Sequence, residues 1–323
     1  MKFATLPNGT PDGRLHVISR DHSRAAPAQA VKTLQALMEE WDRFEADLQA
    51  EYEAVNEGGG EDFEAKGALA PLPRAWQWLD GSTFATHAEL MATAFGMDPA
   101  PRDRPLMYQG VSDCFWSGTE DITLPSEDDG IDFEGEFGVI CDHVPMGTSS
   151  GAAAAHIRLL VQINDWSLRT IAPVEMKLGF GWVQAKPSCS VAPVAVTPDE
   201  LGGDWRDARI DLTLDIAWNG KQFGAANGYD MGFGFDELIS HAALTRPLVA
   251  GTIIGSGTVS NANYKEVGSS CISEVRAVEF IETGEMKTPF MSFGDRVRME
   301  ATGRDGTPLF GVIDQKVVPV SSR

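Results

Sequence analysis

The sequence predicts an α+β protein with a mixed, mostly β main domain and a small N-terminal α/β appendage. Helical periodicity is concentrated early, where apolar residues recur at helical spacing from Val31 to Val55. Alternation of apolar and polar residues dominates later, most clearly from Ile210 to Trp218. We therefore expect a hairpin and a long helix within an appendage over residues 1–75, and one larger domain over residues 76–323.

Turn signals divide the expected elements. Asn8-Gly9 and Asp12-Gly13 indicate a small N-terminal hairpin, and Gly58-Gly59-Gly60 ends the helix that starts near Val31. Asn219-Gly220 after the strand 210–218 favours a tight type I′ turn, and Asp305-Gly306 indicates a second hairpin over residues 297–318. Between these hairpins we expect a short helix over residues 235–244 and then a glycine-rich segment over residues 251–257.

Composition narrows the possible partners. The 26 Lys plus Arg residues against 47 Asp plus Glu give a formal net charge of -21, which repels nucleic acid and anionic membranes. No apolar run is long enough to span a bilayer, and the first residues lack the pattern of a signal peptide, so we expect a cytoplasmic protein. The four cysteines are widely spaced and are expected to be reduced packing residues.

An acidic run is the strongest local signal. In Ile131-Asp132-Phe133-Glu134-Gly135-Glu136 the acids alternate with other residues, so on a strand Asp132, Glu134 and Glu136 would share one face. Like charges this close repel unless a cation neutralises them, and an all-oxygen set suits a hard divalent ion. The alternative is a solvated acidic strand face.

Three further residues could support chemistry. Asp165 ends the apolar stretch Val161–Asn164, where a side chain can meet a ligand or cap the next turn. Lys186 follows the loop Gly179–Gly181 and could stabilise an anion or be solvated. His87 lies in a segment with helical spacing, where a general base and an ordinary histidine are both possible.

A serine motif offers a different class of function. Gly147-Thr148-Ser149-Ser150-Gly151 matches the Gly-x-Ser-x-Gly pattern of serine esterases and precedes a helix-favouring alanine run. The same residues also form a typical helix N-cap, which we consider the better interpretation of Ser149.

Several separated motifs appear in the order found in the fumarylacetoacetate hydrolase family, which the chain resembles from about residue 78 to the C-terminus. They are Asp132-Phe133-Glu134-Gly135-Glu136, Asn164-Asp165-Trp166-Ser167-Leu168-Arg169, Lys186 and Ser256-Gly257-Thr258-Val259-Ser260. The resemblance implies the β-sandwich roll of the fumarylacetoacetase type for the main domain.

The resemblance also implies roles for individual residues. Its metal ligands correspond to Asp80, Glu134, Glu136 and Asp165, which would hold Mg²⁺ or Ca²⁺, with Mn²⁺ a further possibility, and Asp132 then lies outside the ligand set or is solvated. Its catalytic residues correspond to His87, Lys186 and Glu274, with Glu274 orienting the histidine and expected on a strand. Its substrate-side residues correspond to Tyr108, Arg169 and Thr258. Departures at Ser82, Ala172 and Met176 make fumarylacetoacetate itself an unexpected substrate.

The resulting hypothesis is a metal-dependent hydrolase that cleaves a carbon–carbon bond in a diketo or acylpyruvate-type acid, as in aromatic compound catabolism. Keto-acid isomerases and decarboxylases on the same metal site remain as alternatives. A serine esterase using Ser149 and a non-catalytic metal-binding module represent other classes. The partner is then a small keto acid, and a homodimer is expected from the resemblance alone.

Overall fold

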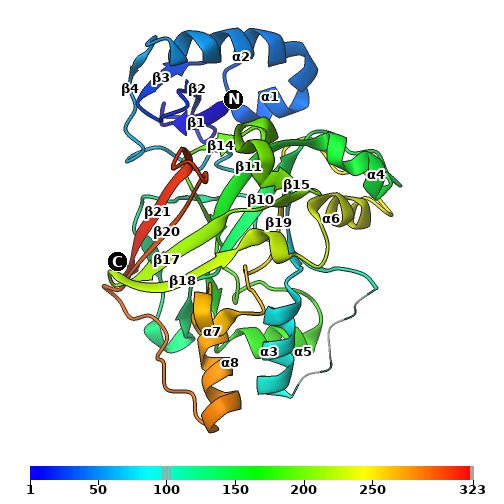
Figure 1. The fold of residues 1–323 in the computed structure, drawn as a ribbon, viewed down its shortest axis with the longest axis vertical. Coiled ribbons are helices and arrows are strands. Elements are labelled where there is room, and N and C mark those ends of the chain that lie inside the picture. The colour runs from blue at the N-terminus through cyan, green and yellow to red at the C-terminus, as the bar shows by residue number, and fades with distance from the viewer. Residues whose placement is uncertain (97, 99–100, 102, 321–323) are drawn as a thin grey trace.

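The computed structural model describes residues 1–96, 98, 101 and 103–320 (Figure 1). The N-terminal elements are β1 (Lys2–Leu6), β2 (Arg14–Ile18), β3 (Arg24–Pro27), α1 (Leu34–Glu39), α2 (Trp41–Asn56) and β4 (Glu61–Asp62). They lie at one end of the molecule, and the helices α3 (Ala85–Phe95), α7 (Tyr264–Val267) and α8 (Ile272–Thr283) lie at the other end.

The remaining strands are β5 (Trp78–Ser82), β6 (Leu106–Gly110), β7 (Trp116–Ser117), β8 (Ile122–Leu124), β9 (Ile131–Asp132), β10 (Gly135–Cys141), β11 (Ile157–Asn164), β12 (Ser167–Leu168), β13 (Ser190–Val191), β14 (Ala195–Val196), β15 (Trp205–Arg206), β16 (Arg209–Ile210), β17 (Thr213–Trp218), β18 (Lys221–Asn227), β19 (Thr252–Gly255), β20 (Arg296–Thr302) and β21 (Pro308–Pro319). The remaining α-helices are α4 (Ser150–Ala153), α5 (Ala172–Leu178) and α6 (Phe235–Ala242). Short 3-10 turns occur at Glu127–Asp129, Ala154–His156, Pro198–Asp204 and Gly228–Asp230.

Two large sheets and two separate strand pairs, β9 with β12 and β15 with β16, contain these strands, which confirms the predicted mixed, mostly β main domain. Within the described residues the larger sheet has 12 strands, with the path β4-β3-β2-β1-β14-β11-β10-β19-β5-β6 and with β13 and β7 beside it. The smaller sheet has the order β18-β17-β20-β21-β8. The N-terminal strands therefore extend the large sheet directly, because Lys2 and Phe3 of β1 pair with Val196 and Ala195 of β14.

Alternation along the strands separates two hydrophobic cores. On β10, Phe137 and Val139 face the small sheet, and the Phe137 ring lies 5.9 Å from the Phe310 ring of β21. Ile140 points to the opposite face, where α1 and α2 cover the sheet with residues such as Leu37 and Leu48. Successive strand residues point to opposite sides, so one strand supplies both cores.

The predicted N-terminal helix is wrong in one respect. The chain turns at Glu40, whose φ of -134° is not helical, so α1 and α2 replace one continuous helix. The turn lets Leu34 and Leu37 of α1 pack into the same core as Leu48 and Tyr52 of α2. Periodicity alone continues across Glu40 and gives no sign of this break.

All three predicted hairpins are confirmed as antiparallel pairs, the N-terminal one as β1 with β2 and the two later ones as β17 with β18 and β20 with β21. The turn residues Asn219 and Gly220 both have positive φ, 50° and 74°, as a type I′ turn requires. The strand predicted over residues 210–218 is shorter in the structure, because Ile210 belongs to β16 and β17 begins at Thr213. The expected helix at residues 235–244 is α6, and the glycine-rich segment contains a strand, β19.

The acidic run does not form one strand. Phe133 and Glu134 separate β9 from β10, and Glu134 instead forms an isolated bridge with Cys271. The main-chain N–H of Glu134 donates to the side-chain oxygen of Asn164 at 3.0 Å, and its carbonyl accepts from Asp165 at 3.0 Å. The prediction that Asp132, Glu134 and Glu136 share one face of one strand is therefore wrong. Within the described residues, no helix combines the length and apolar character needed to cross a bilayer.

Candidate active site

Three acidic side chains meet at the end of the large sheet. Asp80 lies on β5, Glu136 on β10 and Asp165 directly after β11, and each has one carboxylate oxygen that lies within 4.8 Å of those of the other two. All three are buried. The structure thus brings together three of the four predicted metal ligands from three separate segments.

A glycine makes this approach possible. Strand β19 lies between β10 and β5, and its residue Gly255 pairs with Gly138 on one side and Asp80 on the other. A Cβ atom at Gly255 would come within 2.3 Å of Asp80 Oδ1 and 2.4 Å of the Trp78 ring. The absence of a side chain at Gly255 therefore leaves the space in which the carboxylates of β5 and β10 meet.

Glu136 indicates that a cation belongs in this group. Both of its carboxylate oxygens are buried, and neither has a hydrogen-bond partner among the described residues. Burial and the carboxylates of Asp80 and Asp165 raise the pKa of Glu136 well above its usual value, and burial with Asp165 does the same for the pKa of Asp80. Three buried carboxylates, one of which has both oxygen atoms unused, fit a hard divalent ion.

Asp165 is the most heavily bonded member of the group. Its Oδ2 accepts hydrogen bonds from the Tyr108 hydroxyl at 2.5 Å and from Lys186 Nζ at 2.6 Å, and its Oδ1 accepts from the Cys189 thiol at 2.8 Å. Cys189 therefore contacts the site directly, which its prediction as a packing residue did not include. The Tyr108 ring also lies beside Trp182, with ring centroids 5.9 Å apart.

Glu134, the fourth predicted ligand, lies between two cations. Its Oε1 accepts from Arg169 and its Oε2 from Lys186, each at 2.5 Å. Burial alone would raise the pKa of Glu134, but Arg169 and Lys186 outweigh burial and lower that pKa. A carboxylate oxygen has more than one lone pair, so Glu134 can contribute to a metal site while it keeps these bonds. Its ligand role stays a prediction.

Lys186 remains charged in this setting. Its side chain is 7% exposed, and burial alone would lower the pKa of its ammonium group. Asp165 and Glu134 reverse that effect and raise the pKa of Lys186. A lysine held in its charged form cannot act as a general base near neutral pH, but it can stabilise negative charge on a bound substrate.

Asp132 has a structural role that the sequence did not reveal. It is fully buried, and its two carboxylate oxygens accept from the main-chain N–H groups of Ile272 and Ser273 at 2.7 and 2.9 Å. It also accepts from Arg169 Nε at 2.8 Å. Asp132 therefore fixes the start of α8 and orients Arg169, a predicted substrate-side residue whose guanidinium group lies on Asp132 and Glu134.

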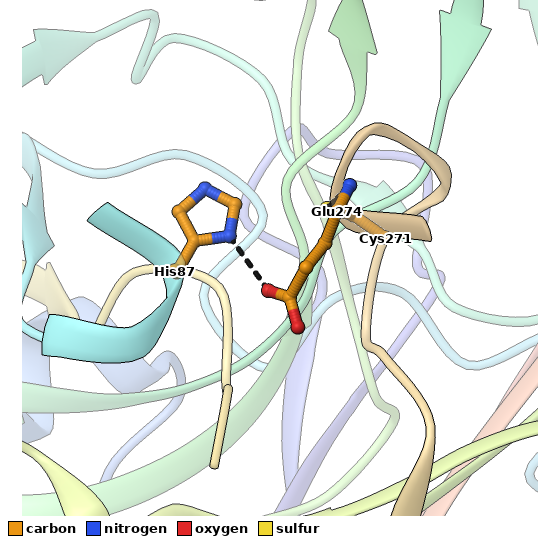
Figure 2. Close-up of side chains that lie close together, drawn as sticks. All are labelled: His87, Cys271 and Glu274. Atoms are coloured by element: carbon orange, nitrogen blue, oxygen red, sulfur yellow. Dashed lines mark hydrogen bonds and ion pairs between the residues drawn. The ribbon is translucent and has the colours of Figure 1, made fainter. Parts of the chain in front are cut away.

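A histidine–glutamate pair lies next to the carboxylates. His87 Nδ1, in the first turn of α3, is 2.9 Å from Glu274 Oε2, in the first turn of α8 (Figure 2). The isolated bridge between Glu134 and Cys271, the N-cap residue of α8, places the pair close to the acidic group. Glu274 is on a helix and not on a strand as we expected, and packing of Leu90 and Ala94 against Ala277 holds α3 beside α8.

Two serines fix the glutamate. Glu274 Oε1 accepts hydrogen bonds from Ser260 Oγ at 3.0 Å and Ser269 Oγ at 3.2 Å, which leaves Oε2 for His87. In the same loop, the main-chain N–H of Gly257 donates to Asp80 Oδ1 at 3.1 Å. The segment Ser256–Ser260 thus joins the carboxylate group to the histidine pair, with the buried predicted residue Thr258 between the two contacts.

The serine motif lies elsewhere. Ser149 occupies the N-cap position of the short helix α4, but its side chain makes no capping hydrogen bond. Among the hydrogen bonds of the described residues, none joins Ser149 to a histidine. The predicted position as N-cap is confirmed, and the capping bond that we expected from it is not formed.

Sequence reasoning missed several residues of this site. Gly255, Cys189, Cys271, Ser260 and Ser269 all contact the residues described above. The signal for Gly255 was available, because a glycine at the end of a strand pattern often marks a close approach of neighbouring groups. The two cysteines carry no such signal, since their contacts depend on long-range pairing.

Comparison with known proteins decides the family. The model of the fumarylacetoacetate hydrolase C-terminal domain matches residues 77–318, and that of the fumarylacetoacetase N-terminal domain 2 matches residues 1–74. The chain belongs to the fumarylacetoacetate hydrolase family. The resemblance seen in the sequence motifs is confirmed, and the chain is an enzyme of a family that includes hydrolases and isomerases.

Individual members of this family are distant from the chain. A 2,4-didehydro-3-deoxy-L-rhamnonate hydrolase of Sphingomonas sp. is 28% identical over 163 residues, which are 50% of this chain and 54% of that protein, about half its length. The structure of a maleylpyruvate hydrolase from Sphingobium sp. SYK-6 with manganese (II) ion and pyruvate has a TM-score of 0.66 at 16% identity, with 99% of both chains covered. A 5-carboxymethyl-2-hydroxymuconate delta-isomerase from Mycobacterium smegmatis has a TM-score of 0.63 at 17% identity, with 100% of both chains covered. These two structures share the fold.

Proposed function

We propose that this chain is a divalent-metal-dependent hydrolase that cleaves a carbon–carbon bond in a diketo or acylpyruvate-type acid of aromatic catabolism. The observation that supports hydrolysis is the pair His87–Glu274, in which His87 is partly exposed and the buried glutamate is fixed by Ser260 and Ser269. Cleavage by water needs a base that accepts a proton, and a histidine oriented by a carboxylate provides one.

The pair defines which atom takes the proton. Glu274 Oε2 engages Nδ1 of His87, so Nε2 is the ring nitrogen that can remove a proton from water. The imidazolium that results is stabilised by the Glu274 carboxylate. Ser260 and Ser269 keep that carboxylate from turning away, which preserves the ring orientation during the reaction.

Cleavage also creates negative charge on the departing keto fragment. A divalent ion held by Asp80, Glu134, Glu136 and Asp165 would polarise the keto oxygen and offset that charge. Lys186, which donates to Asp165, adds a positive charge beside the carboxylate group. Tyr108 is held by Asp165 and Arg169 by Glu134, and in these positions both side chains would orient the keto-acid substrate.

The relatives support this assignment. One solved neighbour is named as a maleylpyruvate hydrolase in complex with manganese (II) ion and pyruvate, and the curated relative is named as a 2,4-didehydro-3-deoxy-L-rhamnonate hydrolase. The donor set of this chain is entirely oxygen, which suits Mg²⁺, Ca²⁺ or Mn²⁺. We propose Mg²⁺ as the first ion to test.

Isomerisation or decarboxylation of a keto acid is the second candidate. It requires stabilisation of an enolate but no activated water, and the solved isomerase with the same fold supports it. The oriented histidine favours hydrolysis, because the carboxylate group with Lys186 would serve the alternative without it.

A substrate panel distinguishes the candidates. The chain is incubated with Mg²⁺ and a series of acylpyruvates and diketo acids, loss of enol absorbance is followed, and products are identified by mass. Hydrolysis yields pyruvate and a second acid, whereas an isomerase yields a product of unchanged mass and a decarboxylase releases carbon dioxide. If EDTA leaves the activity intact, the metal-dependent proposal fails and an esterase becomes the better interpretation.

We also propose that the chain forms a homodimer. Large apolar side chains are exposed on and after α5, namely Val174, Met176, Leu178, Phe180 and Val183. A grouping of this kind on a protein surface often marks an interface. Sedimentation equilibrium measures the mass directly, and a mass of one chain at micromolar concentration contradicts the proposal.

A further inference from the structure

A second group of metal-ligating side chains lies beside the carboxylates and has a different chemistry. His87, Cys271 and Glu274 each offer one ligand atom, and these atoms lie within 4.8 Å of one another (Figure 2). Cys271 and Glu274 are buried, and His87 is 15% exposed and gives access from outside. The first group offers oxygen alone, whereas this one offers nitrogen, sulfur and oxygen.

The two groups should therefore select different ions. Hard cations such as Mg²⁺ and Ca²⁺ prefer oxygen ligands, and Zn²⁺ prefers thiolate and imidazole. A tetrahedral zinc site with bonds of about 2.0 to 2.3 Å spaces its ligand atoms roughly 3.5 Å apart. His87 Nδ1 and Glu274 Oε2, which are 2.9 Å apart, would need to separate slightly, and the sulfur of Cys271 would need to approach by little more than about 1 Å.

We propose that His87, Cys271 and Glu274 form a zinc site that inhibits the enzyme. Zn²⁺ takes the place of the proton between His87 Nδ1 and Glu274 Oε2 and of the proton on the Cys271 thiol, and both protons leave to solvent. A water molecule completes the four ligands. Inhibition by Zn²⁺ rests on the proposed function, because the ion would occupy the His87–Glu274 pair that activates water. Binding of Zn²⁺ to the three side chains does not depend on the proposed function.

The position of Cys271 supports this arrangement. Cys271 is the N-cap residue of α8, and its sulfur accepts the main-chain N–H of Glu274 at 3.3 Å. The capping bond holds the thiol at the same helix start from which Glu274 projects. Serine is a better capping residue than cysteine, so Cys271→Ser keeps the cap and removes the soft ligand.

Cobalt(II) provides the direct test, since it adopts zinc-like sites and a cobalt–thiolate bond gives a charge-transfer absorption in the near ultraviolet. The full chain is kept reduced, saturated with excess Mg²⁺ to occupy the oxygen group, and titrated with Co²⁺. We expect one thiolate band per chain that is displaced by Zn²⁺ and is absent from Cys271→Ser. No substrate is needed.

Two matched variants identify the sulfur. Cys114 is exposed and distant in sequence from both groups, and Cys189 contacts Asp165 in the oxygen group. Cys114→Ser and Cys189→Ser should both keep the cobalt band. Absence of the band in wild type, its persistence in Cys271→Ser or its loss in Cys189→Ser alone would each overturn the site.

Inhibition is measured separately once a substrate is known. Zn²⁺ should inhibit wild type in the presence of excess Mg²⁺. Cys271→Ser should need at least about tenfold more Zn²⁺, relative to its own zinc-free rate, since even loss of a group that only orients a metal ligand typically costs about 10- to 100-fold in affinity. A cobalt band without zinc inhibition contradicts the inhibitory role and keeps the site. If no substrate is turned over, the proposed function fails and the cobalt result still stands.

Discussion

Asp80 and Glu136 lie on strands that are not neighbours, and their carboxylates meet across Gly255 on the strand between them. The cation site that we propose therefore depends on a residue with no functional group. Each carboxylate comes from a rigid sheet strand, so the site is held in shape before an ion binds.

Gly255→Ala should weaken metal binding. The added methyl group would lie 2.3 Å from Asp80 Oδ1, so the Asp80 carboxylate must shift from its present position. We expect Mg²⁺ affinity, measured by calorimetry, to fall about 10- to 100-fold, the range for disturbed metal-site geometry. Gly151→Ala is a suitable control, because a Cβ there meets no atom within 4 Å. Equal affinities in the two variants would show that the close approach at Gly255 is unimportant.

Glu136→Gln should change how stability depends on pH in EDTA. Folding raises the pKa of Glu136 above its ordinary value of 4.5, because burial and its acidic neighbours favour the protonated form. The stability from this group is fully present below pH 4.5 and is lost as the pH rises toward the folded pKa. Glutamine mimics the protonated form, so the Tm of the variant relative to wild type should increase with pH. Thermal melts between about pH 5 and about pH 8 measure this difference.

Mg²⁺ should have the opposite effect on the Tm difference between wild type and Glu136→Gln. In wild type the Glu136 carboxylate can bind the ion, so the Tm of wild type should increase more on addition of Mg²⁺ than the Tm of Glu136→Gln does. A parallel pH dependence of the two proteins in EDTA, together with equal Mg²⁺ shifts, would remove Glu136 from the ligand set.

His87→Ala should abolish carbon–carbon hydrolysis and leave Mg²⁺ binding intact. The loss of a positioned general base typically costs about 10²- to 10⁴-fold in rate. Exchange of the C3 protons of pyruvate with deuterated water, followed by NMR, should suffer less, because polarisation of the carbonyl does not require His87. Native hydrolysis by a folded His87→Ala protein would leave isomerisation or decarboxylation as the better assignment.

Ser149→Ala should have little effect on either activity or stability. Ser149 lies at the N-cap of α4 without a capping hydrogen bond and is exposed, so no bond is lost. We expect the free energy of unfolding, from urea titration, to change by less than about 0.5 kcal/mol. Loss of turnover in the folded variant would restore the serine esterase hypothesis.

The sequence predicted those parts of the fold whose signals are local. The hairpin at Asn219-Gly220 follows from turn chemistry, and the helix α6 from its periodicity. The interruption at Phe133-Glu134 could not be predicted, because Glu134 forms a bridge with Cys271, far along the chain. The break at Glu40 could not be predicted because the helical periodicity continues across it.

The candidate site also contains residues that the sequence predicted and contacts that it could not predict. The resemblance to the family led to Asp80, Glu136, Asp165, His87 and Glu274. The structure places the first three in one group and the last two in another. The bonds of Asp132 to the start of α8 span 140 and 141 residues, and no local pattern could reveal them. Through these contacts Asp132, an acid of the family motif, bonds the first main-chain N–H groups of α8.

The pairing of β1 with β14 has a consequence for any attempt to shorten the protein. Without residues 1–74, β14 would present an unpaired edge, and one face of the sheet around Leu159 and Val161 would lose its cover from α1 and α2. Exposed edges and apolar faces of this kind promote association between chains. We therefore expect residues 1–74 to protect the main domain from aggregation. A chain without them should precipitate before its activity can be assayed.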